Sequence, residues 1–287
     1  MLSYSDMQRV FSREVLLSLA EHRSNDFYDT TLQNNNSATS LDLFKDIYNL
    51  LIKNYRSDFV FRSLIAQKIF LSRHSLSKSV LINELRIGTT KADMVILNGS
   101  STAYEIKSDI DNFARLSNQL TQYIKVFDYV FVVVSHKRLH NVLDSVSNNV
   151  GIMVLSESNK IRTQRKAISN KRNVIPSVIF DTLRKDEYSK IITQEFGAAP
   201  NVPNTRFFTE CKKMFCTLPP ERAHDIFVQS LKHRVNYSSK LKSFIKVYPD
   251  FLQYPVLRGC FTDNQIDGLN SRLFNDWGNH VLSIPQG

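Results

Sequence analysis

Two acidic residues and a lysine constrain this chain more than any other feature of its sequence. Asp93, Glu105 and Lys107 follow one another as D-x(11)-E-I-K. Side chains alternate between the two faces of a β-strand, so Glu105 and Lys107 would share one face while Ile106 points to the other. A fold that accommodates this pattern places a carboxylate and an ammonium group side by side on a sheet.

A β-hairpin is expected directly before this strand. Apolar runs lie on both sides of the turn sequence N-G-S-S at 98–101, and Asn-Gly is a strong hairpin signal. A turn centred near Gly99 would place Asp93 opposite Glu105. Directly opposed residues have Cβ atoms roughly 4.5–5.5 Å apart and point to the same face. Two carboxylates would therefore meet beside Lys107.

Two facing carboxylates repel each other, and one of them would tend to stay protonated without a ligand. A divalent cation removes this repulsion, and Mg²⁺ is usually held by one or two carboxylates together with water and substrate phosphate. The pattern therefore predicts a site for Mg²⁺ or Mn²⁺ that hydrolyses phosphodiester bonds. Lys107 would hold or deprotonate the attacking water, or offset charge on the scissile phosphate, and the sequence leaves both roles open.

These residues resemble the PD-(D/E)XK nuclease superfamily. More narrowly, the stretch from about 80 to 135 is similar to the bacterial sce7726 family, through the segments Lys91-Ala92-Asp93, Tyr104-Glu105-Ile106-Lys107-Ser108-Asp109, Arg115-Leu116 and Gln119-x-x-x-Tyr123. The resemblance implies an α/β fold with a restriction-endonuclease-like mixed β-sheet core flanked by helices. It also implies cleavage of DNA, in phage defence, mobile-element biology or repair. One departure is that no proline precedes Asp93, a position that varies in the superfamily.

The resemblance assigns roles to individual residues. The metal ligands that it implies are Asp93, Glu105, Glu84 and the backbone carbonyl of Ile106. The catalytic residues are these three carboxylates with Lys107, Gln119 and Tyr123, the last two orienting site groups and the nucleic-acid backbone. Taken singly, each residue has a plainer interpretation: Glu105 and Lys107 could form an exposed ion pair, and Glu84 could pair with Arg86 or Lys91.

The chain is basic, with 37 Lys and Arg against 27 Asp and Glu and a formal net charge of +10. Such a charge attracts phosphate without sequence preference. Part of the excess lies in the tract 160–172, which contains no acidic residue. The residues expected to contact nucleic acid are Lys91, Arg115, Arg162, Arg165 and Lys166. The alternative interpretation of the tract is a solvated basic linker.

The length favours one catalytic domain with helical extensions. We expect an N-terminal helical segment at 1–75, a nuclease core at 76–160, a basic linker at 161–175 and a C-terminal α-helical region at 176–287. Inside the core, the apolar run at 129–134 predicts a buried strand.

No apolar run approaches the roughly 18–20 residues that cross a bilayer, and the start lacks the pattern of a signal peptide. We therefore expect a cytoplasmic protein without membrane contact. DNA is the expected partner, with RNA left open, and the C-terminal helices could form a homodimer or bind a protein.

Two other classes of function remain open. The first is a catalytically silent or partner-activated nucleic-acid-binding protein. The second is a protein-interaction factor of the antitoxin, immunity or inhibitor type, which would use the basic surface to meet an acidic partner.

Overall fold

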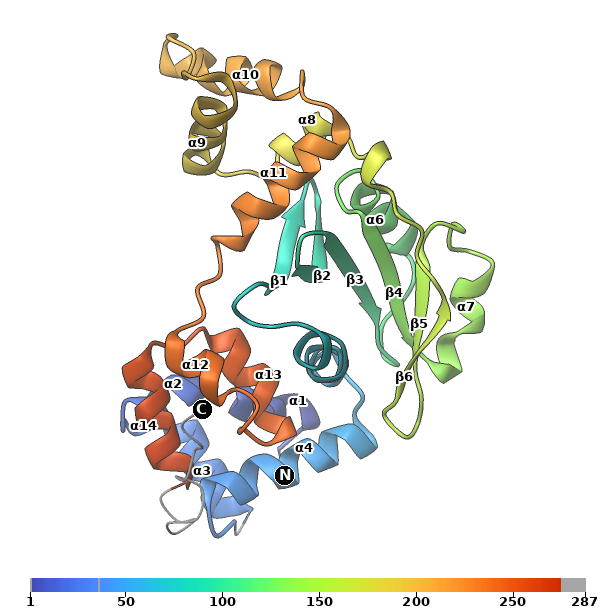
Figure 1. Cartoon of the computed structure of the whole chain (residues 1–287). Coiled ribbons are helices and arrows are strands. Elements are labelled where there is room, and N and C mark those ends of the chain that lie inside the picture. Colours follow the sequence, from blue (N-terminus) through green and yellow to red (C-terminus); the bar gives the residue numbers. More distant parts are fainter. Residues whose placement is uncertain (1, 36, 275–287) are drawn as a thin grey trace. The chain divides into compact units, whose positions relative to one another are not determined.

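The computed structural model describes residues 2–35 and 37–274. The chain divides into two compact units. The first combines both ends of the chain, 1–71 and 236–287, and the second is the continuous segment 72–235. Figure 1 shows that helices make up the first unit and that the second contains the sheet.

This division differs from the expected one. The N-terminal segment and the last part of the region 176–287 belong to one helical unit, whereas 176–235 belongs to the unit that contains the sheet. The stretch 161–175 is more than a linker, because it begins with a strand that pairs in the sheet. Residues 275–287 of the expected C-terminal region lie outside the described residues.

The first unit consists of helices whose starts carry polar caps. Ser12, Thr39 and Ser238 each accept a hydrogen bond from a backbone N–H in the first turn that follows them. The helices are α1 (Tyr4–Gln8), η1 (Arg9–Phe11), α2 (Arg13–Ala20), α3 (Asp26–Asn34), α4 (Ser40–Asn54), α5 (Asp58–Ile65), η2 (Ala66–Leu71), α12 (Ser239–Phe244), α13 (Asp250–Gly259) and α14 (Asp263–Phe274).

Apolar contacts join the two ends of the chain in this unit. The ring of Phe59 stacks on Phe11 with centroids 4.9 Å apart and meets the ring of Tyr254, from α13, at 6.0 Å. Gly268 of α14 lies directly against the carbonyl of Ala20 at the end of α2. The absence of a side chain at Gly268 therefore lets α14 and α2 approach closely.

We expect Gly268→Ala to lower the free energy of unfolding of the first unit. Glycine to alanine in an open helix usually stabilises by about 1 kcal/mol. Here the new Cβ would overlap the Ala20 carbonyl, and overpacking costs about 1–3 kcal/mol. Urea unfolding measures the change, with Asn264→Ala on an exposed position of α14 as the control. An unchanged or raised stability in Gly268→Ala would contradict the close approach.

The second unit contains a six-stranded mixed sheet in the order β1-β2-β3-β4-β5-β6. The strands β3, β4 and β5 run parallel, and the other neighbours are antiparallel. The strands are β1 (Val80–Ile87), β2 (Thr90–Leu97), β3 (Ser101–Lys107), β4 (Tyr129–Ser135), β5 (Gly151–Leu155) and β6 (Ile161–Arg165). Its helices are α6 (Leu116–Tyr123), η3 (His136–Arg138), α7 (His140–Leu143), η4 (Lys171–Asn173), α8 (Pro176–Phe180), α9 (Lys185–Phe196), α10 (Asn204–Phe215) and α11 (Pro220–Lys232).

The mixed α/β class and the central hairpin are confirmed. β2 and β3 pair antiparallel across the Asn-Gly turn, with Leu97 opposite Ser101 and Met94 opposite Tyr104. The strand expected at 129–134 is β4, in which the side chains of Val130, Val132, Val133 and Val134 are buried. None of the described helices is both long and apolar enough to cross a membrane.

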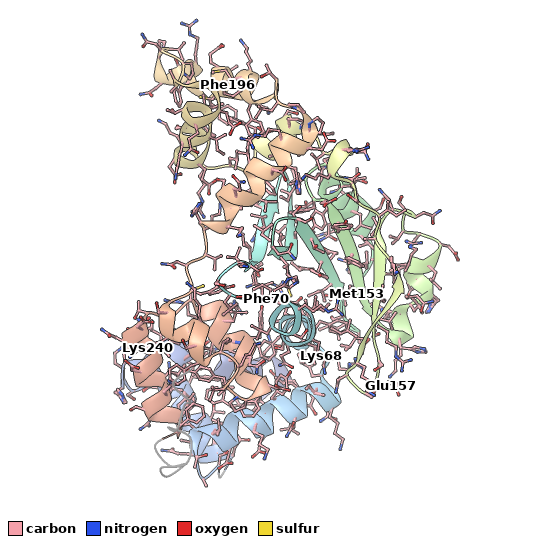
Figure 2. All side chains as sticks on the ribbon, in the orientation of Figure 1. Lys68, Phe70, Met153, Glu157, Phe196 and Lys240 are labelled. Atoms are coloured by element: carbon pink, nitrogen blue, oxygen red, sulfur yellow. The ribbon has the colours of Figure 1, made fainter. Side chains whose placement is uncertain are left out.

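Helices α6 and α11 cover the same face of the sheet. Ser101 and Glu105 are four residues apart on β3 and therefore point to the same face. Ser101 contacts His224 of α11, and Glu105 contacts Tyr123 of α6. Phe127, just after α6, meets Phe227 of α11 with ring centroids 6.2 Å apart. Met153 of β5 is in register with Val133 and Ile106 and is buried on the other face, and Phe196 lies at the end of α9 away from the strands (Figure 2). The face under α6 and α11 carries the candidate site.

Candidate functional site

The hairpin brings the two predicted carboxylates together. The pairing of β2 with β3 ends at Met94 and Tyr104, and Asp93 and Glu105 are the next residues of the two strands. The Asp93 carboxylate accepts a hydrogen bond from the backbone N–H of Ile106, with 2.8 Å between Oδ2 and N. This bond crosses from β2 to β3 and orients the Asp93 carboxylate beside Glu105.

Glu105 and Lys107 form a buried ion pair. Lys107 Nζ donates to Glu105 Oε1 at 2.8 Å and to Gln119 Oε1 at 2.9 Å. Glu105 is only 1% exposed and Lys107 8%. The solvated surface pair considered above is therefore excluded as an explanation of this pattern.

Helix α6 supplies the second donor to Glu105. Tyr123 OH donates to Glu105 Oε2 at 2.8 Å and also contacts the backbone carbonyl of Lys91 on β2. Gln119 and Tyr123 are one helical turn apart, so both reach the strand from the same face of α6. The helix is thereby tied to β2 and β3 through the site itself.

Burial dominates the electrostatics of this cluster. Burial raises the pKa of the Glu105 carboxyl, although the neighbouring Lys107 ammonium and the hydrogen bonds from Lys107, Tyr123 and Gln119 oppose the rise. Burial and the adjacent Glu105 carboxylate also raise the pKa of Tyr123, so its hydroxyl remains a donor. A further cation beside Glu105 would favour its ionised form.

The donor set suits a hard cation. The carboxylates of Asp93 and Glu105 and the carbonyl of Ile106 supply only oxygen, which Mg²⁺ and Mn²⁺ accept. Within the described part of the chain there is no group of three or more His, Cys, Asp or Glu side chains placed to hold a metal ion. Any cation here would rest on these two carboxylates and one carbonyl, with water as its remaining ligands.

Glu84 lies at the border of this cluster. Its neighbours pair as Asn83 with Met94 and Leu85 with Ala92, which sets Glu84 across from Asp93. The Glu84 side chain is 55% exposed, and its carboxylate is 3.7 Å from Lys91 Nζ. Lys91 thus flanks the site through its ammonium and through the carbonyl that Tyr123 contacts.

The other expected contacts divide into two groups. Arg115 precedes α6 one turn before Gln119 and is exposed. Arg162 and Lys166 lie on or beside β6, three strands from β3, which corresponds to about 14 Å at the usual spacing. They are not part of the cluster around Glu105.

Arg165 has a structural role that the charge pattern did not indicate. Its guanidinium donates to the carbonyls of Val150 at 3.0 Å, Val146 at 2.9 Å and Ser147 at 3.0 Å. The Arg165 guanidinium therefore donates its hydrogen bonds to the segment that precedes β5. Lys171 and Arg172 in the same tract pair with acidic residues of α11, at 2.6 and 3.4 Å.

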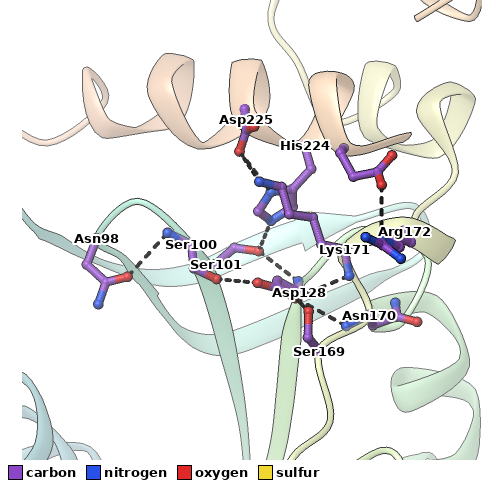
Figure 3. A network of polar contacts seen from close by, with 11 residues as sticks. Asn98, Ser100, Ser101, Asp128, Ser169, Asn170, Lys171, Arg172, His224 and Asp225 are labelled. Atoms are coloured by element: carbon purple, nitrogen blue, oxygen red, sulfur yellow. Dashed lines mark hydrogen bonds and ion pairs between the residues drawn. The ribbon is translucent and has the colours of Figure 1, made fainter. Parts of the chain in front are cut away.

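A second polar network on this face was missed by the sequence reasoning (Figure 3). Asp128 accepts hydrogen bonds from Ser100 Oγ at 2.7 Å, Ser169 Oγ at 2.5 Å and the backbone N–H groups of Asn170 and Lys171 at 3.1 Å each. Burial raises the pKa of Asp128, but these hydrogen bonds outweigh it and leave the pKa below its ordinary value. The carboxylate holds the turn after β2 and the chain after β6 to the start of β4.

His224 extends the network to α11. Its Nε2 lies 2.7 Å from Ser101 Oγ, which also accepts from the backbone N–H of Asp128 at 3.0 Å. Its Nδ1 is 3.7 Å from Asp225 Oδ1 and has no hydrogen-bond partner among the described residues. Because Ser101 and His224 are far apart in sequence, no local pattern could have indicated their contact.

We expect unfolding stability to fall between pH 7 and 5 because of His224. Burial lowers the pKa of His224 below 6.5, and Lys171 adds to this while Asp128 and Asp225 oppose it. Below pH 6.5 the unfolded chain thus binds the proton more readily, and stability decreases by at most about 1.4 kcal/mol per pH unit. Urea unfolding at several pH values measures the slope. His224→Gln should flatten it, and an equal slope in both proteins would contradict the assignment.

The fold and the buried cluster define a mixed α/β protein with a carboxylate–lysine site on its sheet. The family model for Bacteriophage P4 protein cII matches residues 53–251, more than half of the chain. The chain therefore belongs to the family of bacteriophage P4 protein cII.

Two individual comparisons add detail. Protein cII of Enterobacteria phage P4 is 37% identical over 86 residues, which is 29% of this chain and 33% of the phage protein. The match thus spans about a third of that relative. A solved protein of unknown function from Silicibacter pomeroyi covers 50% of this chain and 92% of its own, at 14% identity and a TM-score of 0.32.

Proposed function

We propose that this chain is a metal-dependent phosphodiesterase that cleaves DNA, built on a restriction-endonuclease-like core of the PD-(D/E)XK type. The observation that carries the proposal is the buried cluster of Glu105, Lys107, Gln119 and Tyr123 next to Asp93. The order of three antiparallel strands, a helix and a parallel fourth strand supports such a core.

The residues of the cluster would divide the chemistry among themselves. Asp93, Glu105 and the Ile106 carbonyl would hold Mg²⁺ or Mn²⁺, with Glu84 at the border. The bound cation would stabilise charge on the phosphate and lower the pKa of a water ligand. Lys107 uses two of its three N–H donors within the protein, so the third can be donated to the attacking water or to a phosphate oxygen.

The helix α6 would position these groups. Tyr123 and Gln119 fix Glu105 and Lys107 from one side, so neither side chain needs to reorganise when substrate arrives. Arg115 at the start of α6 and Lys91 beside Glu84 would contact the nucleic-acid backbone. The relation to a phage protein supports a role in mobile-element biology.

A second candidate is a nucleic-acid-binding protein that is catalytically silent or needs a partner for activity. The specific observation for it is that both carboxylate oxygens of Glu105 already accept hydrogen bonds within a buried cluster. The family relation fits this second candidate better than the first, because the description of protein cII names no enzymatic activity.

Incubation of the purified protein with supercoiled plasmid, linear duplex, single-stranded DNA and RNA, each with Mg²⁺, Mn²⁺ or EDTA, tests the proposal. We expect metal-dependent cleavage that falls about a hundredfold or more in Lys107→Ala and in Asp93→Asn. Lys213→Ala, which removes an exposed lysine of α10, serves as the matched control.

Folding must be checked alongside activity. Lys107→Ala leaves Glu105 buried without its ion pair, and breaking a buried pair costs about 3–5 kcal/mol. Circular dichroism of each variant therefore accompanies the assay, and Asp93→Asn keeps the pair of Glu105 and Lys107 intact. Binding without cleavage by the wild-type protein under all conditions would refute the first candidate and support the second.

A further inference from the structure

A groove runs along the outer edge of β1 beside the candidate site. It has a volume of about 470 Å³, within the range of about 300–1,000 Å³ that is typical of ligand sites. One wall is the strand, including Asn83, Glu84 and Arg86, and the other is formed by Thr182 and Arg184, between α8 and α9, together with Arg234 after α11. β1 is first in the order of the sheet, so no described strand covers this edge.

Glu84 is the residue that the groove shares with the border of the candidate site. Glu84 lies across from Asp93 in the register and also lines the groove. Its φ of 54° is a left-handed value within a strand, and such backbone irregularities cluster at functional sites. A ligand that follows β1 would therefore pass Glu84, next to the strand that carries Asp93.

The ion pairs around the groove leave it positively charged. The Asp181 carboxylate is bound by Lys212 Nζ at 2.6 and 2.7 Å, and Glu84 lies near Lys91 Nζ. Arg234 is in turn bound by Glu187 at 2.5 and 2.6 Å.

Two arginines remain after these pairs. Arg86 donates to the backbone carbonyl of Gly88 at 3.2 Å, which leaves its charge in place, and Arg184 is exposed. Neither is within ion-pair distance of a carboxylate among the described residues; the Arg184 charge helps to lower the pKa of Glu187, whose carboxylate is bound by Arg234. Their positive charges are therefore available to an anionic ligand.

We infer that this groove binds the phosphodiester backbone of one nucleic-acid strand that leads out of the candidate site. Arg184 and Arg86, on opposite walls, contact successive phosphates. A single strand fits because a positively charged groove that tracks the backbone is the usual way in which proteins bind single-stranded nucleic acid. The inference deepens the proposed function, on which the nature of the ligand rests, but strand binding does not require cleavage.

Fluorescence anisotropy with a labelled oligo-dT in EDTA tests the groove without any cleavage. In the full-length chain, we expect the double variant Arg86→Gln, Arg184→Gln to bind about tenfold more weakly than the wild-type protein. The slope of affinity against salt should also decrease in magnitude by about 1.4, because each phosphate contact on a single strand contributes about 0.7. The double variant Arg206→Gln, Lys213→Gln, at two exposed positions of α10, is the matched control for lost charge.

The outcomes separate the groove from the proposed enzyme. Strand binding that depends on Arg86 and Arg184 supports the groove even if the wild-type protein cleaves nothing with metal. Equal losses in the groove variant and in the control variant Arg206→Gln, Lys213→Gln would overturn the inference, whether or not cleavage occurs. If the edge of β1 binds no nucleic acid, the ligand to test next is an extended peptide, which can add to a sheet edge as a further strand.

Discussion

The buried ion pair of Glu105 and Lys107 is the interaction on which the arrangement of the second unit depends. Removing a carboxylate and an ammonium from water costs several kcal/mol per ion, and their attraction offsets this only if the remaining polar atoms are satisfied. Gln119 and Tyr123 provide that satisfaction from α6. The position of α6 on β2 and β3 is therefore set by polar geometry as well as by its buried leucines.

The other end of β3 is held by a different kind of polar contact. Ser101 links the backbone of Asp128 to His224, which places α11 over the start of the strand. Both helices thus lie on one face, each joined to β3 by a buried hydrogen bond. At the edge of the sheet, β1 has no further strand beside it in the described part of the chain, and the segment after α8 forms the far wall of the groove.

The helical unit is built from both ends of the chain, so the sheet unit is inserted between its halves. Contacts such as Phe59 with Tyr254 and Gly268 with Ala20 join the N-terminal and C-terminal halves of the helical unit. Such contacts join residues far apart in sequence and must offset a large loop-closure entropy. The polar caps that start α2, α4 and α12 act locally and make the helices ready for this packing.

The sequence by itself determined the local part of the structure. Alternation along a strand and the Asn-Gly turn predicted the hairpin and the shared face of Glu105 and Lys107, because both depend on residues a few positions apart. The helical spacing of Gln119 and Tyr123 likewise predicted that they act from one side of a helix. Charge patterning was less informative, since Arg165 proved to bind backbone carbonyls.

Only the tertiary structure decided which distant segments meet. The burial of Glu105, the contact of His224 with Ser101 and the union of the two chain ends have no local signal in the sequence. The groove beside β1 arises in the same way, from a strand and a helix connection that lie about a hundred residues apart. Local patterns specify strands, turns and helix faces, whereas the free energy of burial and of closing long loops determines how these elements combine.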